Sequence, residues 1–389
     1  MTTPERTIII AGGGTGGHVF PGLAVAHVLR ELADVNVVFI GSPRGIESRV
    51  TPQHGYDLEL LEVEPMKGGG ASRAIRGALV AAKATRHATG IVGRLRPAAV
   101  LSVGGYAAGP GALACVRQRV PLAVLEPNSV LGLANKLLVP FAKRAYVAWA
   151  ETVRSPKTRT FGVPLRPGFE PRAYLPKSGV RRVLVLGGSQ GAEALNERVP
   201  RALAHVLGKG FELHVTHQTG KDREEATRAA YEKAGVKNAS VLSFIDDVAA
   251  QIAAADVVVA RSGASTVAEI SAIGRASILV PFPHAADDHQ AKNALALEAL
   301  GGTVCIRQEV ADEACLATEL SKLLEDESAA VRMADASRAH GRPDAAEDIA
   351  RDLLGLAGIA VKRKKDPVKP TNGAAGGPSG HHVTSKEVS

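Results

Sequence analysis

The stretch that decides the fold is residues 8–22, which read IIIAGGGTGGHVFPG. A β-branched run leads there into five glycines among the six residues 12–17, and then into His18 and an apolar segment. β-Branched residues favour a strand, and a glycine turn at the start of a helix lets backbone N–H groups approach a phosphate without interference from Cβ atoms. We therefore predict a strand, a phosphate-binding turn and a helix that opens at Pro21.

The residues around this turn help to distinguish the kinds of phosphate-binding site that it could form. Gly12, Gly14 and Gly17 match the pattern G-x-G-x-x-G, which is weak on its own. A dinucleotide site also needs an acidic residue at the end of the second strand, where this chain reads FIGSP. A P-loop needs a lysine at the position of His18. A tight turn without a ligand is a further alternative.

Short apolar runs alternate with longer helical patterns, which is typical of βαβ units around a parallel sheet. Two series of strands are predicted, at 7–11, 36–40, 98–103, 122–126 and 145–148, and at 182–187, 212–216, 240–244, 256–260, 276–280 and 303–306. Each series opens on a glycine turn, the second reading VLVLGGSQGA at 183–192, and the Pro-rich segment 155–171 between the series is predicted to be a linker. We expect two Rossmann-like α/β domains that face each other across a cleft, with ligands at the carboxyl ends of the strands.

The composition argues against several classes of protein. The 389 residues carry a net charge of +8, and aromatic residues make up 4% of them, so nothing indicates a nucleic-acid-binding protein. Cys115, Cys305 and Cys315 lie far apart, which indicates a reducing compartment rather than a disulfide framework. The sequence shows neither a signal peptide nor a membrane-spanning apolar run, so we expect a cytoplasmic protein. Residues 362–389 are rich in Gly, Pro and Lys, and we expect a disordered basic tail.

The second half of the chain carries a polar turn with an acidic residue behind it. Residues 255–293 read ADVVVARSGASTVAEISAIGRASILVPFPHAADDHQAKN, with the turn RSGAST where a predicted strand meets a helix. Glu269 follows Thr266 by three residues, which is the spacing of a capping box. Glu269 is therefore expected either to cap the helix or to accept hydrogen bonds from a sugar diol. Asp246-Asp247 and Asp287-Asp288 are adjacent pairs, and we predict no metal site and no cofactor.

The motifs occur in a definite order. They are GGGTGGH (12–18), SVGGYAAGP (102–110), EPN (126–128), GVPLR (162–166), GGSQGA (187–192), RSGASTVAE (261–269) and PFPHAADDHQ (281–290). This ordered set resembles the MurG family of peptidoglycan N-acetylglucosaminyltransferases, over residues 7 to about 355. The resemblance implies a GT-B fold. It also implies inverting transfer of N-acetylglucosamine from UDP-N-acetylglucosamine to the 4-hydroxyl of the muramoyl sugar of lipid I, which gives lipid II.

The resemblance also implies roles for individual residues. The residues expected to bind the donor are Thr15, Gly16, Gly17, Asn128, Arg166, Ser189, Ile245, Ala264, Ser265, Thr266, Val267, Ala268, Glu269 and Gln290. Those expected on the acceptor side are Gly14, Gly104, Gly105 and Tyr106. His18 and Glu126 are the rival candidates for the general base, and an imidazole has a suitable pKa for that role. Pro127 and His289 depart from the family pattern, which commonly has glutamine at both positions.

The expected partners follow from the same resemblance. Besides the donor and lipid I they include an anionic membrane surface, reached from the cytoplasmic face of the inner membrane, while contacts with other cell-wall proteins are left open. Residues 67–96 hold seven Lys and Arg residues with Ile75, Leu79, Ile91, Val92 and Leu95 among them, which suits a lipid-facing helix or an ordinary solvated one.

We expect an acceptor domain over residues 1–163 and a donor domain over 164–361, and leave open whether the last helix stays with the second domain or crosses back to the first. Two alternative functions are another UDP-sugar transferase with a different acceptor and a nucleotide-binding scaffold without catalysis.

Overall fold

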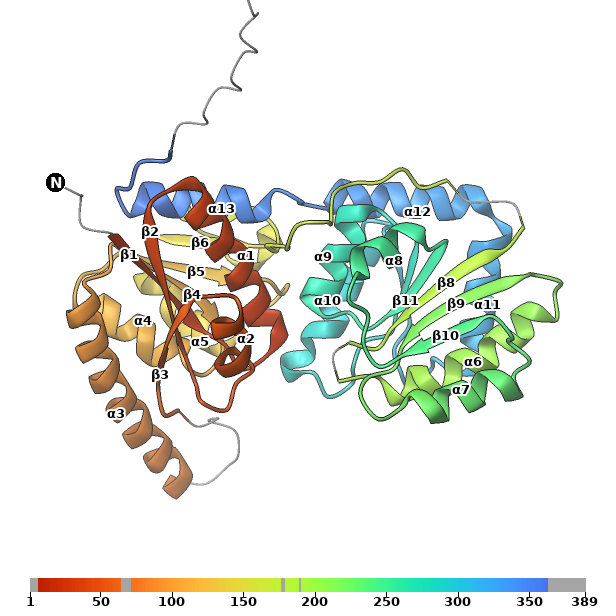
Figure 1. The fold of residues 1–389 in the computed structure, drawn as a ribbon, viewed down its shortest axis with the longest axis horizontal. Helices are drawn as coiled ribbons and strands as arrows, with labels where there is room; N and C mark the ends of the chain where they lie inside the picture. Colours follow the sequence, from red (N-terminus) through yellow and green to blue (C-terminus); the bar gives the residue numbers. More distant parts are fainter. Residues whose placement is uncertain (1–5, 64–70, 176–178, 189, 363–389) are drawn as a thin grey trace, which may run out of the picture.

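The computed structural model describes residues 6–63, 71–175, 179–188 and 190–362, apart from the side chains of residues 71–79 and 81. Two α/β lobes lie side by side, each built around its own parallel sheet (Figure 1). The predicted fold class is therefore confirmed.

The N-terminal sheet has seven strands in the order β3-β2-β1-β4-β5-β6-β7, all parallel. They are β1 (Arg6–Gly12), β2 (Val35–Gly41), β3 (Asp57–Leu60), β4 (Ala99–Gly104), β5 (Leu122–Glu126), β6 (Arg144–Val147) and β7 (Thr158–Thr160). Ile8 of β1 pairs with Val37 on one side and Ala99 on the other. The strand order reverses between β1 and β4, which is where a ligand crevice forms in such sheets.

The C-terminal sheet has six parallel strands in the order β10-β9-β8-β11-β12-β13. They are β8 (Arg181–Leu186), β9 (Leu213–Gln218), β10 (Ala239–Leu242), β11 (Val257–Ala260), β12 (Ser277–Leu279) and β13 (Val304–Cys305). Here the order reverses between β8 and β11. The second glycine turn follows β8 and the RSGAST turn follows β11, so both stand at the second crevice.

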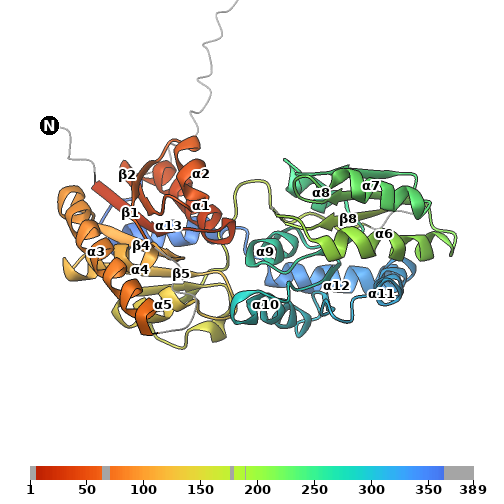
Figure 2. The same ribbon diagram turned by 90° about the horizontal axis from the view of Figure 1, so that it is seen from below.

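Helices cover both faces of each sheet, and the residues of the central strands are therefore nearly all buried. In the N-terminal lobe they are α1 (Gly16–Leu32), α2 (Glu47–Gln53), α3 (Ala71–Leu95), α4 (Ala108–Arg117), α5 (Leu133–Leu138), η1 (Val139–Phe141) and η2 (Ala150–Thr152). In the rest of the chain they are α6 (Glu193–Leu207), α7 (Glu224–Lys233), α8 (Val248–Ala254), α9 (Ala264–Ile273), η3 (Ala286–Asp288), α10 (His289–Glu298), α11 (Glu313–Glu325), α12 (Glu327–His340) and α13 (Ala345–Leu356). In the N-terminal lobe α1 and α13 pack on one face of the sheet and α3 and α4 on the other (Figure 2).

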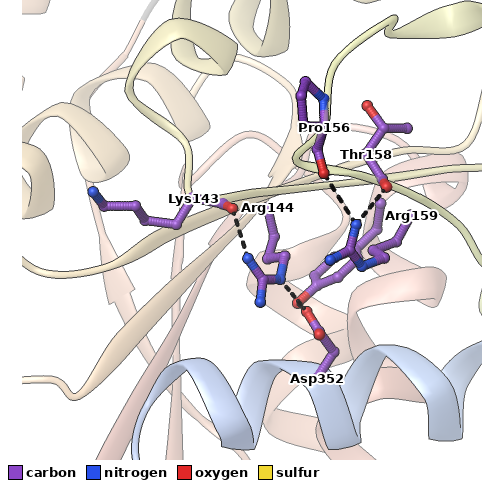
Figure 3. A network of polar contacts seen from close by, with 7 residues as sticks. Lys143, Arg144, Pro156, Thr158, Arg159 and Asp352 are labelled. Atoms are coloured by element: carbon purple, nitrogen blue, oxygen red, sulfur yellow. Dashed lines mark hydrogen bonds and ion pairs between the residues drawn. The ribbon is translucent and has the colours of Figure 1, made fainter.

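The chain crosses between the lobes twice. The first crossing follows β7, and the second leads from α12 back to α13, which lies along the N-terminal lobe (Figure 1). Asp352 of α13 accepts hydrogen bonds from Arg144 at 2.9 Å and from Tyr146 at 2.8 Å, which joins this helix to β6 (Figure 3). The crossings touch each other, because a Cβ atom on Gly162 would lie 2.5 Å from Cβ of Arg342.

Three local predictions were wrong. Helix α1 begins at Gly16 and contains Pro21 in its interior, because the glycines themselves form the first turn. The linker prediction overlapped an edge strand, β7, whose polar sequence gives no strand signal. The capping box is absent: Gly263 is the N-cap of α9, no side chain caps this helix, and Glu269 lies well beyond its first turn.

The lipid-facing surface was also placed partly wrongly. Ile91 and Val92 are 3% and 0% exposed and belong to the core between α3 and the sheet. The side chains of Ile75 and Leu79 lie outside the described residues. Exposed apolar side chains occur instead on α5 and η1, where Leu133, Leu137 and Phe141 are 59%, 64% and 54% exposed. In the part of the chain that the structure describes, no helix is both long and apolar enough to cross a membrane.

Candidate active site

The two glycine motifs of the N-terminal lobe pack directly on each other. Gly13 donates its N–H to the carbonyl of Gly104 at 3.0 Å. A Cβ atom on Gly12 would lie 2.2 Å from that carbonyl oxygen, and one on Gly105 would lie 2.0 Å from the oxygen of Gly13. Some of these glycines are therefore required for close backbone packing between the turns that follow β1 and β4. Gly14, with φ at +92°, has open space where its Cβ would be.

His18 lies in the first turn of α1, close to this packed pair of turns. Its Nδ1 atom is 3.1 Å from Oγ1 of Thr15, and its Nε2 atom would be 3.1 Å from a Cβ on Gly104. Burial lowers the pKa of His18, an effect that the carboxylate of Glu126 opposes and His289 supports. The neutral imidazole is therefore the favoured form at neutral pH.

Glu126 ends β5 and is 2% exposed. Its Oε1 atom accepts hydrogen bonds from the backbone N–H and side-chain amide of Asn128, at 3.2 and 3.0 Å. Its Oε2 atom accepts from Gly132 N–H at 2.9 Å and from the Asn135 amide at 3.1 Å. Four donors thus surround this carboxylate, which fixes the loop between β5 and α5.

The N-terminus of α9 presents the polar turn of the C-terminal lobe. Ser262 is fully buried, and its hydroxyl donates to the carbonyl of Gln290 at 2.8 Å. The buried hydroxyl of Ser265 has no hydrogen-bond partner among the described residues. Such a group is an expected contact for a ligand. The unpaired N–H groups at the start of α9 also favour an anion.

Glu269 lies on α9 behind this turn. Burial raises its pKa to about 7, and the guanidinium of Arg166 opposes the shift. No hydrogen bond to its carboxylate is found within the described ranges. Arg166 is exposed and lies with its guanidinium 5.7 Å from the ring centre of Phe169. A partly buried carboxylate and an exposed arginine thus stand beside a helix end that favours an anion.

The remaining residues predicted to bind the donor are spread around the same crevice. Ile245 is buried after β10, next to Phe244, whose ring is 56% exposed. Ala264 and Val267 are buried, whereas Thr266 and Ala268 are partly exposed. The side-chain oxygen of Gln290 accepts from the N–H of Phe282 at 3.0 Å. Ser189 lies outside the described residues.

The acidic pairs have other partners. Asp247 caps α8 by accepting from Ala250 N–H at 2.9 Å, and Asp288 forms an ion pair with Arg307 at 2.9 Å. Asp287 and Asp288 both adopt the left-handed conformation, with φ of 53° and 55°. This strained turn leads directly into His289 at the start of α10.

The two crevices meet at the lobe interface, where α1 and α9 are neighbours (Figure 2). Asn293 of α10 is fully buried; it donates to the side-chain oxygen of Asn128 at 3.2 Å and accepts from Ser129 N–H at 2.8 Å. The structure therefore brings together Thr15, His18, Asn128 and the α9 turn. Tyr106, 46% exposed, stands with Gly104 and Gly105 at the end of β4.

Two family models match the chain. They are the glycosyltransferase family 28 N-terminal domain, over residues 8–147, and the glycosyltransferase family 28 C-terminal domain, over residues 182–349. A relative from Sorangium cellulosum (strain So ce56) is named UDP-N-acetylglucosamine--N-acetylmuramyl-(pentapeptide) pyrophosphoryl-undecaprenol N-acetylglucosamine transferase. It is 52% identical over 358 residues, which cover 90% of this chain and 88% of the relative. The crystal structure of Acinetobacter baumannii MurG is 31% identical, covers 90% of this chain and 99% of its own, and has a TM-score of 0.76.

The chain belongs to the MurG family.

One further relative supports the same family, and a more distant structure shares the fold alone. A relative from Burkholderia vietnamiensis (strain G4 / LMG 22486) with the same name is 40% identical over 93% of this chain and all of its own. The kitacinnamycin glycotransferase is 17% identical with a TM-score of 0.61, and that likeness concerns the GT-B arrangement alone.

Three residues of this MurG-family chain were missed by the sequence reasoning. Phe244 stands beside a predicted donor residue as an exposed ring, and the motif FIDD contained it. Asn293 closes the quoted segment 255–293, but only the fold shows that it reaches Asn128. Glu47 lies in SPRGIES, a stretch without any motif.

Proposed function

We propose that this chain transfers N-acetylglucosamine from UDP-N-acetylglucosamine to the 4-hydroxyl of the muramoyl sugar of lipid I, giving lipid II and UDP. One observation carries the proposal beyond family membership. The helix that bears His18 and the helix that bears Glu269 meet across the lobe interface, which supports placing the proposed base and the proposed nucleotide-sugar site next to each other.

The donor is proposed to bind the C-terminal lobe. Its pyrophosphate would lie at the N-terminus of α9 and near Arg166, since both favour an anion. The ribose diol would donate hydrogen bonds to Glu269, whose carboxylate has no partner in the described part of the chain. The N-acetylglucosamine would then extend toward Gln290 and Asn128.

His18 is proposed as the general base. With its proton on Nδ1 and donated to Thr15 Oγ1, the Nε2 lone pair faces the side of Gly104, which has no side chain to block an acceptor hydroxyl. The 4-hydroxyl oxygen attacks the anomeric carbon, its proton passes to Nε2, and the bond from that carbon to the UDP oxygen breaks. A single displacement of this kind inverts the anomeric configuration.

A different role is proposed for Glu126. Its carboxylate already accepts four hydrogen bonds, so it has no free lone pair directed at a substrate. Its negative charge opposes the lowering of the pKa of His18 and stabilises the imidazolium formed when the base takes the proton. Glu126 is therefore proposed to hold the loop 127–132 and to support the base.

A membrane-facing surface is also proposed, because the acceptor is a lipid. Residues 65–150 contain twelve Lys and Arg residues and one acidic residue, Glu126, which is buried. The exposed side chains of Leu133, Leu137 and Phe141 stand in the same part of the chain, with Lys136 and Lys143 between and beside them. Each basic residue near an anionic surface contributes about 1 kcal/mol. We propose that α3, α4 and α5 approach the cytoplasmic leaflet.

These assignments imply that each lobe binds one of the two substrates. Residues 1–163 are proposed to receive the lipid acceptor and residues 164–361 the nucleotide donor, with α13 returning to the acceptor lobe.

A transfer assay tests the proposed function. The protein is incubated in detergent with UDP-N-acetylglucosamine and a short-chain lipid I analogue, and the glycolipid product is measured by mass spectrometry. We expect one added N-acetylhexosamine per acceptor and no transfer to a soluble muramic acid derivative without pyrophosphate. Transfer to the soluble acceptor at an equal rate would support a different transferase, and donor binding without any transfer would support a scaffold.

A further inference from the structure

Glu47 is a buried carboxylate that the mechanism above does not use. It begins α2 and is 1% exposed. Its Oε1 atom accepts from the N–H and the hydroxyl of Ser42 at 2.9 and 3.0 Å, and its Oε2 atom accepts from Gly14 N–H at 2.7 Å. No lysine, arginine or histidine among the described residues forms an ion pair with it. Backbone and hydroxyl donors therefore hold this anion, as they would hold a bound phosphate.

Three glycines enclose the side chain. A Cβ atom on Gly13 would lie 2.3 Å from Cδ of Glu47, and one on Gly41 would lie 2.4 Å from Cγ. A Cβ atom on Gly45 would lie 2.1 Å from Oε2. These distances leave no room for a side chain at any of the three positions. The glycines come from two segments, the first glycine turn and the stretch from the end of β2 to α2, so the cavity is shaped around the carboxyl group.

The same turn carries the catalytic residues proposed above. Gly14 is followed by Thr15, the N-cap of α1, whose hydroxyl lies 3.1 Å from Nδ1 of His18. A turn with five glycines among six residues has many accessible conformations, and nothing in its own side chains restricts them. Catalysis requires the base to be held within about 0.5 Å of its working position. Contacts from outside the turn must therefore hold it: the Gly104 carbonyl accepts from Gly13 N–H, and the Glu47 carboxylate accepts from Gly14 N–H, next to Thr15.

We propose that Glu47 is a positioning residue of the catalytic site: its carboxylate accepts from Gly14 N–H of the first glycine turn and holds Thr15 and His18 in place. The inference rests on the proposed function. The inference also changes where the pyrophosphate of the acceptor is expected to bind, because Gly14 N–H already donates its hydrogen bond to Glu47. The N–H groups at the start of α1, at Gly16 and Gly17, are then left for the pyrophosphate of lipid I, rather than for the donor to which the resemblance assigned them.

The charged groups around His18 are Glu126, His289 and Glu47 itself, and all three act on its pKa. Glu126 and Glu47 raise the pKa, whereas His289 lowers it. Removal of Glu47 therefore changes both the position of the base and its electrostatic surroundings.

The first test replaces the carboxylate by an amide. In Glu47→Gln the amide N–H₂ group faces a donor, because one oxygen cannot serve Ser42 and Gly14 together. We expect kcat to fall at least ten-fold per folded molecule, with the KM for UDP-N-acetylglucosamine changed less than two-fold. Hydrogen exchange of the backbone over residues 13–18, measured without substrates, is expected to accelerate. Glu31→Gln, an exposed acid on α1, is the matched control and is expected to leave both unchanged.

The second test uses the glycine cage. Gly45→Ala is expected to displace the carboxylate and reproduce the kinetics of Glu47→Gln. In a Glu47→Ala background the added methyl group has space, so Gly45→Ala is expected to cause no further loss of kcat. Gly90→Ala, where a Cβ meets no atom within 4 Å, controls for the loss of a glycine.

The outcomes separate the inference from the proposed function. If wild-type protein transfers no sugar, the proposed function fails, while hydrogen exchange and the melting temperatures of the Gly45 and Glu47 variants still test the anchor. If Glu47→Gln lowers only the melting temperature and keeps the wild-type kcat per folded molecule, the positioning role is overturned. Unchanged exchange over residues 13–18 in Glu47→Gln, or additive losses in the double variant, would also overturn it.

Discussion

At the scale of single residues, His18 carries the sharpest prediction. Burial keeps its imidazole neutral and thus able to accept a proton. His18→Ala is expected to lower kcat by about 10²- to 10⁴-fold with donor affinity nearly intact. The acid limb of the kcat profile should follow an imidazole titration in wild type and be absent in the variant. His27→Ala, which removes an exposed histidine of the same helix, should change neither. A variant profile with the wild-type shape would assign the base elsewhere.

Glu269 gives a second prediction, with a definite sign. Its pKa in the folded protein is raised to about 7 from an ordinary value of 4.5, so the folded state binds the proton more tightly than the unfolded state. Its ionisation therefore destabilises the fold increasingly from about pH 4.5 to 7 and by a constant amount above that.

The amide variant removes this destabilisation. Glu269→Gln should melt a few degrees higher than wild type at pH 8, with a smaller difference at pH 5, and its KM for UDP-N-acetylglucosamine should rise about ten-fold through loss of a charge-assisted hydrogen bond. Glu232→Gln, an exposed acid on α7, is the control. An unchanged KM would remove Glu269 from the donor site.

At the scale of elements, the sequence predicts what is periodic and local. The central strands are apolar on both faces and were all predicted, because burial on both sides leaves a continuous apolar run. The edge strands β3 and β7 are polar and were missed. Their residues are partly or fully exposed, so their sequences lack the continuous apolar run that predicts a buried strand. The anchor at Glu47 was missed for another reason. Its partners Ser42 and Gly14 come from different loops, and no spacing in the sequence records that contact.

The motifs predicted residues that the structure brings close together. Thr15, His18, Asn128 and the α9 turn do lie together, because parallel strands bring their carboxyl ends to one edge. The hydrogen bonds of Glu126 could not be predicted from EPN, since two of its donors, Gly132 and Asn135, lie outside the motif.

Helix α5 supplies a prediction about membranes. Leu133→Ser combined with Leu137→Ser should weaken binding to vesicles of phosphatidylglycerol and phosphatidylethanolamine by at least ten-fold, because each buried leucine contributes about 1.5–3 kcal/mol. Higher salt should weaken wild-type binding further by screening the basic residues. Leu300→Ser removes a leucine that is 54% exposed on the other lobe and serves as the control. Equal vesicle binding of all three proteins in a sedimentation assay would exclude α5 from the membrane contact.

At the scale of the whole molecule, the last helix completes the first lobe. Ile349, Leu353 and Leu354 of α13 are fully buried against α1 and the N-terminal sheet. Leu353→Ala should lower the free energy of unfolding by about 2–5 kcal/mol, measured by denaturant titration. Arg351→Ala, which breaks only an exposed ion pair with Glu347, should cost less than about 0.5 kcal/mol. Equal effects of the two substitutions would mean that α13 does not stabilise this lobe.

The two lobes together are proposed to carry out a single displacement at the place where α1 and α9 meet. The most direct measurement is the anomeric configuration of the product formed from UDP-N-acetylglucosamine and a lipid I analogue, determined by NMR, together with the amount of UDP released. We expect a β-linked disaccharide and one UDP for each linkage formed. An α-linked product, or release of UDP without a disaccharide, would contradict it.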